Sequence, residues 1–201
     1  MVFVFFCVGG VLPPMRRHPS LATRDGAPQA TRTLETDALL LARTLESYSG
    51  AVIVIANDWP FYYDLEELRS SREFGRRIVN VVRTLGSTKE SAVLDFMSGR
   101  AEPFIVIASP DFEFTYLTET RRIDVGIEQG FDEEAQVSLL EHLRLLGEQA
   151  TNPLTEDDML RATVGSRDLK RARKYISPIR AGDDVAFQRK LRYLVSEEAM
   201  R

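Results

Sequence analysis

The stretch MVFVFFCVGGVL, residues 1–12, decides the fold. Val2–Phe6 is a continuous run of apolar residues, and the turn sequence CVGG follows it directly. A continuous apolar run, unlike an alternating one, is typical of a strand buried on both faces of a parallel sheet. The run is too short to cross a bilayer, which takes about 20 residues, and no basic residue precedes it as in a signal peptide. We therefore expect a central strand with its first loop, and neither an export signal nor a membrane anchor.

Four further segments have the composition of strands. Two are strongly apolar, one is weaker, and the last has the pattern of an edge strand; they are Ala51–Ala56, Phe104–Ala108, Ile78–Val82 and Arg122–Ile127. Helical spacing of apolar residues lies between or after them, over Leu34–Tyr48, Asp64–Phe74, Ser87–Met97 and Asp132–Glu148. Strands that alternate with helices of this length predict an α/β fold with a doubly wound parallel sheet.

Charge divides the chain into two parts. The 201 residues carry a net charge of -4, but residues 151–201 hold 11 Lys and Arg against 8 Asp and Glu. This uneven distribution, together with the sequence ATNPLTED at residues 150–157, predicts an α/β domain over residues 1–149. Residues 150–201 are expected to form a small, basic, helical C-terminal extension with helices over 156–162, 166–176 and 184–198.

Cysteine and histidine are scarce. Cys7 is the only cysteine, and His18 and His142 are the only histidines, so the chain has no intrachain disulfide and no Cys- or His-rich metal site. A single cysteine fits a reducing, cytoplasmic setting. We expect no cofactor and no contact with membranes.

Three turns that follow the predicted core strands are candidates for a ligand-binding site. They read CVGGVLPP, NDWPF and SPDFEF. In open α/β sheets, ligands bind outside the carboxyl ends of the strands, which is where these turns meet.

Together these turns resemble the haloacid dehalogenase-like (HAD-like) superfamily, and in particular the compact bacterial HAD domain of RNA-repair proteins. The likeness covers about residues 2–147 and rests on four segments, Val4–Pro14, Ile55–Leu68, Phe104–Phe114 and Gly130–Ala135. It implies a Rossmannoid three-layer sandwich, and it implies a magnesium-dependent phosphohydrolase if the family's catalytic residues are present.

Most of those catalytic residues are replaced. The positions of the nucleophilic aspartate and of the acid/base aspartate hold Cys7 and Gly9. The phosphoryl-binding hydroxyl maps to Ala56 or Asn57, and the acidic pair that completes the magnesium site maps to Ala108 and Ser109; the phosphate-binding lysine has a match in Lys89. A thiol, a methyl group and a hydroxyl do not make the hard carboxylate site that Mg²⁺ requires. The resemblance therefore implies a degenerate, non-catalytic domain, a pseudoenzyme that acts by binding or regulation.

Several residues keep other functions open. Gly9 and Gly10 can form a backbone nest for a phosphate, with Lys89 as its charge partner. Asp58 and Asp111 can make a relocated magnesium site, as in an active hydrolase, although an Asp after a strand more often caps the next turn. Cys7 can act as a replacement nucleophile, but a small buried hydrophobe is the simpler interpretation.

The C-terminal extension contains a basic segment. RDLKRARKY places five cations along one predicted helix, namely Arg167, Lys170, Arg171, Arg173 and Lys174. Such a helix can contact nucleic-acid phosphates, or it can simply be a solvated surface. The expected partner is thus an unidentified protein, a phosphate-containing ligand or, less directly supported, a nucleic acid.

Overall fold

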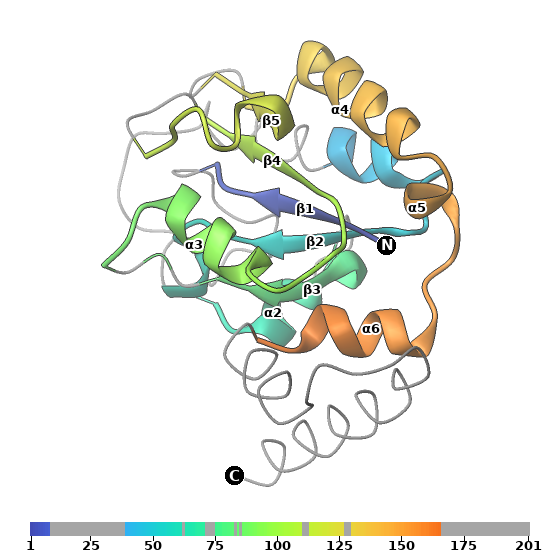
Figure 1. Cartoon of the computed structure of the whole chain (residues 1–201), viewed down its shortest axis with the longest axis horizontal. Coiled ribbons are helices and arrows are strands. Elements are labelled where there is room, and N and C mark those ends of the chain that lie inside the picture. The colour runs from blue at the N-terminus through green and yellow to red at the C-terminus, as the bar shows by residue number, and fades with distance from the viewer. Residues whose placement is uncertain are drawn as a thin grey trace, which may run out of the picture.

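A computed structural model describes residues 1–8, 39–61, 63–70, 75–82, 84, 86–109, 113–126 and 130–165. Its centre is a five-stranded sheet with every pair of neighbours parallel and the order β3-β2-β1-β4-β5 (Figure 1). The strands are β1 (Val2–Phe6), β2 (Ala51–Ile55), β3 (Ile78–Val81), β4 (Phe104–Ala108) and β5 (Arg122–Asp124). The predicted α/β class, the parallel sheet, the central place of β1 and the edge position of β5 are confirmed.

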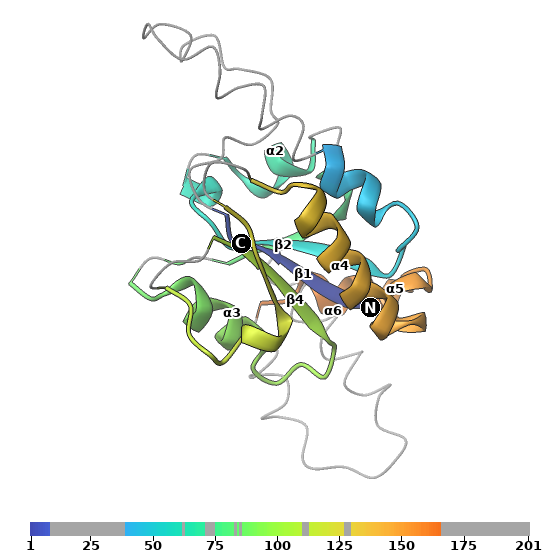
Figure 2. The same cartoon turned by 90° about the horizontal axis from the view of Figure 1, so that it is seen from above.

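Helices cover both faces of the sheet. Figure 2 shows the helix over residues 39–45, α2 (Leu65–Arg69) and α4 (Glu133–Leu146) on one side of the strands. On the other side lie α3 (Lys89–Met97) and α6 (Glu156–Thr163), and the short α5 (Glu148–Thr151) follows α4. Three 3₁₀ turns complete the described elements, η2 (Trp59–Phe61), η3 (Gly75–Arg77) and η4 (Glu119–Arg121).

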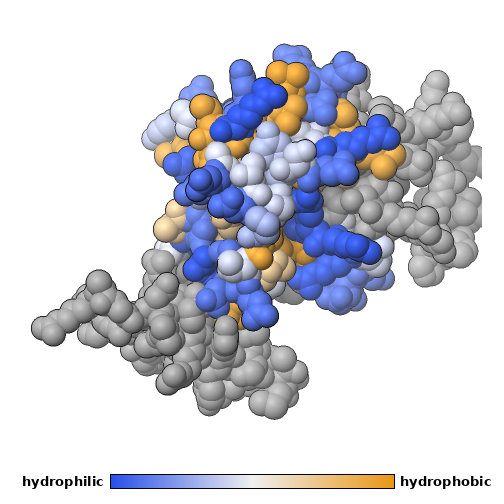
Figure 3. All heavy atoms as spheres, turned by 90° about the vertical axis from the view of Figure 1, so that its right-hand side faces the viewer, coloured by the Kyte–Doolittle hydropathy of each residue, from blue (hydrophilic) through white to orange (hydrophobic). Residues whose placement is uncertain are grey.

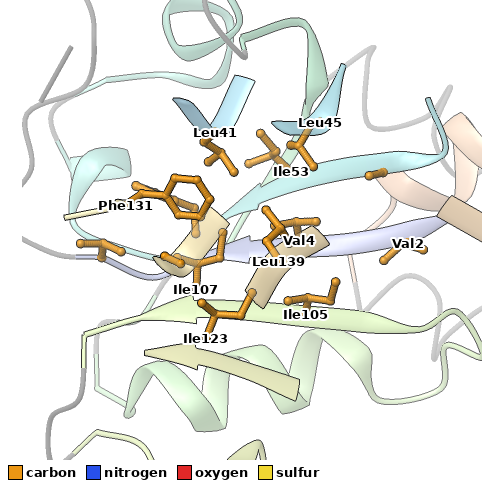
Figure 4. Close-up of a cluster of buried hydrophobic side chains, with 14 of the residues drawn as sticks. Val2, Val4, Leu41, Leu45, Ile53, Ile105, Ile107, Ile123, Phe131 and Leu139 are labelled. Atoms are coloured by element: carbon orange, nitrogen blue, oxygen red, sulfur yellow. The ribbon is translucent and has the colours of Figure 1, made fainter. Parts of the chain in front are cut away.

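Burial on both faces explains the apolar run in β1. Alternate side chains of a strand point to opposite faces, and Val4 accordingly packs with Leu41, Leu45 and Leu139 on the α4 side (Figure 4). Phe3, Phe5 and Cys7 belong to the opposite cluster, which includes Val93 and Phe96 of α3. All five residues of β1 are buried, so no position of the strand is left for a polar residue.

Local capping signals set the helix boundaries. Asp64 and Glu67 form the capping box expected from the sequence, with Asp64 Oδ1 accepting the Glu67 N–H and Glu67 Oε2 accepting the Asp64 N–H, each at 2.8 Å.

The helix predicted to extend from Asp132 to Glu148 is interrupted, which corrects that prediction. Gly147 has φ of 52°, a left-handed conformation that glycine adopts without strain, and it separates α4 from α5.

The start of the predicted C-terminal extension packs on the α/β body. Ala162 and Val164 are buried, and Asn80 of β3 donates from Nδ2 to the carbonyls of Ala162 and Thr163 at 3.2 and 2.8 Å. Arg100 donates to the carbonyls of Arg161, at 2.7 Å, and Val164. The predicted helix over 156–162 is therefore present as α6, whereas the helices predicted over 166–176 and 184–198 lie outside the described residues.

No helix in the described ranges has the length and apolar character that crossing a bilayer requires.

Candidate functional site

The carboxyl ends of β1 and β4 form the topological switch point of the sheet. The chain leaves β1 for β2 on one side of the strand order, and β4 lies on the other side of β1. The Cys7 N–H donates to the Ile107 carbonyl at 2.8 Å, which holds these two strand ends together. Ligands of doubly wound folds bind at such a point, so the residues just beyond both strands are the natural candidates.

Apolar, fully buried side chains occupy that point. Cys7, Ala56 and Ala108 are each 0% exposed, and all three lie in the cluster beneath α3. The cluster that contains Cys7 is otherwise made of apolar side chains, mainly from β1, β2, β4 and α3. Ser109, at the end of β4, is also buried. Cys7 thus has the full burial expected of a small hydrophobe at the end of a strand.

Asn57 joins the ends of β1 and β2. Its side chain is 1% exposed; Nδ2 donates to the Val8 carbonyl at 3.0 Å, and Oδ1 accepts the Trp59 N–H at 3.0 Å. Both ends of the amide are thus used to position the backbone where β1 leaves the sheet. Asn57, a candidate ligand residue from the sequence, has a structural role in this arrangement.

Asp58 differs from its neighbour. Its carbonyl accepts the Phe61 N–H at 3.0 Å and so begins η2. Its Oδ1 is buried, and no donor in the described part of the chain lies within hydrogen-bond reach of it. Burying an acceptor without a hydrogen-bond donor costs free energy of folding. Asp58 Oδ1 is such an acceptor among the described residues at this edge of the sheet.

Lys89 begins α3 and lies against Glu113 from the segment after β4. Glu113 Oε2 accepts the Lys89 backbone N–H at 2.9 Å, and Oε1 lies 3.5 Å from Lys89 Nζ. Thr88 caps the same helix by accepting the Ser91 N–H at 3.1 Å. A helix N-terminus favours negative charge, and here the chain's own Glu113 supplies that charge.

Glu90 is an important residue that the sequence did not reveal. Its carboxylate is only 3% exposed. Oε2 accepts the N–H and the hydroxyl of Thr115, at 2.9 and 2.6 Å, and Oε1 accepts the same two groups of Thr118, at 3.2 and 2.7 Å. Burial by itself would raise the pKa of Glu90, but these hydrogen bonds outweigh it and the pKa lies below its ordinary value.

Glu90 thereby holds the segment that carries Glu113 against the start of α3. In the sequence, Glu90 reads as an ordinary acidic residue in the first turn of a helix. Its partners lie 25 and 28 residues further along the chain, so no local pattern connects them.

The described residues do not fit a magnesium ion. Within these ranges no three His, Cys, Asp or Glu side chains gather closely enough to hold a metal, and Mg²⁺ binds mainly to carboxylate and water oxygens. Several candidates fall outside the described residues and stay predictions: Gly9, Gly10, Asp111, Arg167, Lys170, Arg171, Arg173 and Lys174.

Comparison with protein-family models, with curated proteins and with solved structures found no match to this chain, so the likeness to the HAD-like superfamily rests on the four sequence segments alone.

Proposed function

We propose that this chain is a binding or regulatory domain on a HAD-like frame that does not carry out phosphoryl transfer. The observation that carries the proposal is the complete burial of Cys7, Ala56 and Ala108 at the carboxyl ends of the three central strands. Phosphoryl transfer on this frame needs a nucleophile and a general base within reach of each other. It also needs carboxylates for the metal, and Cys7 and Ala108, at the ends of β1 and β4, supply none.

The ligand chemistry that the edge supports is anionic. Lys89 and the first turn of α3 already hold a carboxylate, because Glu113 contacts both the backbone N–H and the ammonium of Lys89. A phosphate group has the charge and the acceptor oxygens to take the same place. In this proposal Glu113 competes with an external anion, and binding requires the segment after β4 to release its contact with α3.

Two measurements test the proposal together. The full chain is expected to release no p-nitrophenol from p-nitrophenyl phosphate with Mg²⁺ between about pH 5 and 9, a range that spans the ordinary pKa of histidine, about 6.5. Calorimetric titration with inorganic phosphate is expected to give weak binding that strengthens when Glu113→Gln removes the competing carboxylate. Clear turnover that Cys7→Ala abolishes would overturn the non-catalytic proposal.

A relocated magnesium site is a second candidate function, favoured by the buried Oδ1 of Asp58. Mg²⁺ binds carboxylate oxygens and keeps several waters, so Asp58 and Asp111 could hold it between them in an active hydrolase. This alternative requires Mg²⁺-dependent phosphatase activity that both Asp58→Asn and Asp111→Asn remove. If Asp58→Asn leaves an observed activity intact, the alternative fails.

A further inference from the structure

A cleft opens at the opposite end of the sheet from the candidate site, beside the start of β4. It has a volume of about 670 Å³ and lies among the ends of α3, α4 and η4. It lies where β4 has no strand partner on its outer edge, since β5 pairs with Val106, Ile107 and Ala108 but not with Phe104 or Ile105, whose side chains are nevertheless buried. The volume falls within the range of about 300–1,000 Å³ that small-molecule sites occupy.

Apolar side chains form the walls of this cleft. Leu94 and Met97 come from α3, Phe104 from β4, and Leu145 and Leu146 from α4. Leu145 is 86% exposed, an unusually open position for a leucine at the end of an amphipathic helix. Figure 3, which views the side of the molecule that carries α5, shows apolar residues at the surface among hydrophilic ones. The walls therefore suit an apolar ligand body.

The charged residues of the cleft differ in how far they are engaged. Arg100 donates from Nε to the Phe96 carbonyl at 2.9 Å and from Nη1 to the Arg161 carbonyl at 2.7 Å. The Glu102 carboxylate lies 3.2 Å from Arg161 Nε. Both side chains thus have partners within the protein and are not available to a ligand without breaking those contacts.

Arg121 is the available cation. Its guanidinium carbon lies 4.7 Å from the centre of the Phe104 ring, and no ion pair within the described ranges involves it. Attraction between the cation and the ring holds the Arg121 guanidinium beside Phe104 in the lining of the cleft. A planar guanidinium held in this way matches a carboxylate, which it can bind through two parallel hydrogen bonds.

His142 adds a second polar group. Its Nδ1 lies 2.9 Å from the Ser138 carbonyl, and because a carbonyl only accepts, Nδ1 carries the hydrogen. That bond fixes the ring and leaves Nε2 as the ring nitrogen that a ligand can use. Arg121 and His142 both line the cleft, so a ligand there meets one fixed cation and one oriented imidazole above apolar walls.

We infer that this cleft binds a small amphipathic carboxylate, with its apolar body against Leu94, Met97 and Leu145 and its carboxylate on Arg121. Strand addition by an extended peptide is the main competing occupant. It is disfavoured because only Phe104 and Ile105 of β4 lack a partner in β5, too short an edge for a ladder of backbone hydrogen bonds. The inference concerns a separate site and does not depend on the function proposed for the carboxyl ends of the strands.

Sodium decanoate below its micelle concentration is the probe, with decanol as the uncharged analogue. Calorimetric titration of the full chain is expected to show decanoate binding, with an affinity about tenfold above that of decanol, the difference typical of one charge-assisted contact. Arg121→Gln is expected to lower decanoate affinity by about the same factor. Arg76→Gln removes an exposed arginine outside the cleft and is expected to change nothing.

A second variant guards against a folding defect in Arg121→Gln, since that change also uncovers Phe104. Ser98→Trp places a large ring at an exposed position of the cleft lining and is expected to abolish binding while the thermal unfolding midpoint stays near that of the wild type. The inference is overturned if decanoate does not bind the wild-type chain, as a peptide site would predict. It is also overturned if Ser98→Trp binds decanoate as tightly as the wild type does.

Discussion

Glu113 contacts Lys89 twice, at the backbone N–H with one carboxylate oxygen, 2.9 Å away, and at the ammonium with the other, 3.5 Å away. Both contacts lie at the start of α3, where the helix dipole is positive. The positive end of this helix therefore already has an internal anion. Phosphate affinity measures whether that anion competes with an external one.

Glu113→Gln is expected to raise the affinity of the chain for inorganic phosphate by about tenfold, because it removes a competing negative charge from a partly buried ion pair. Isothermal titration calorimetry at low salt measures the change. Glu134→Gln, an exposed acidic residue in the first turn of α4, is the matched control and should leave phosphate affinity unchanged. Equal phosphate affinities for wild type and Glu113→Gln would show that Glu113 does not compete with the anion.

Glu90→Gln is expected to lower the free energy of unfolding by about 2 kcal/mol or more, because hydrogen bonds to a charged acceptor contribute about 1.5–3 kcal/mol each and the amide of Gln turns one acceptor into a donor. Denaturant unfolding at pH 7 measures the loss. The control is Glu66→Gln, whose side chain is 80% exposed and should cost less than about 0.5 kcal/mol. Similar losses for the two variants would argue against a special role for Glu90.

The stabilisation by Glu90 is also expected to depend on pH. The pKa of Glu90 is lowered in the folded chain, so its contribution is complete above the pKa of the unfolded chain, about 4.3, and is lost as the pH falls through the lower folded value. The difference in unfolding free energy between wild type and Glu90→Gln should therefore be constant from neutral pH down to about 5 and then shrink. A difference that stays constant on acidification below about pH 3 would contradict this account.

Cys7 is expected to resist thiol reagents in the native chain, because it is fully buried at the end of β1. Labelling with Ellman's reagent should be limited by unfolding and should become fast in about 6 M guanidinium chloride, where the chain is unfolded. Ser98→Cys, at an exposed position, provides a reactive thiol in the same fold as a positive control. If Cys7 in the native chain is labelled as fast as the exposed thiol, it is accessible, and it is again a candidate nucleophile.

A chain that ends at residue 149 is expected to lose about 3 kcal/mol or more of unfolding free energy relative to one that ends at residue 165, because core truncation and lost buried hydrogen bonds each cost this order of energy. The shorter chain lacks the buried Ala162 and Val164 and removes the carbonyl acceptors of Asn80 and Arg100. Denaturant unfolding of the two chains measures the difference. Equal stability would place the domain boundary at residue 149, where the charge distribution suggested it.

Local sequence chemistry was sufficient to predict the α/β class, the five strands and the capping box that begins α2. Those features depend on local chemistry: a strand buried on both faces must be apolar throughout, and Asp64 and Glu67 form a capping box within one helical turn. The interruption at Gly147 was missed because a single glycine inside a periodic helical pattern is compatible with a continuous helix until its conformation is known.

Tertiary structure alone decided the contacts that define the candidate sites. Glu90 meets Thr115 and Thr118, and Lys89 meets Glu113, across 24 to 28 residues of chain. The cleft beside Phe104 lies at the start of β4, where the pairing with β5 has not yet begun. The sequence showed that Cys7 and Ala108, and no carboxylates, stand at the ends of β1 and β4, because those positions follow directly from the strand ends. It could not show which side chains meet around these ends, because such contacts depend on the packing of segments that are distant along the chain.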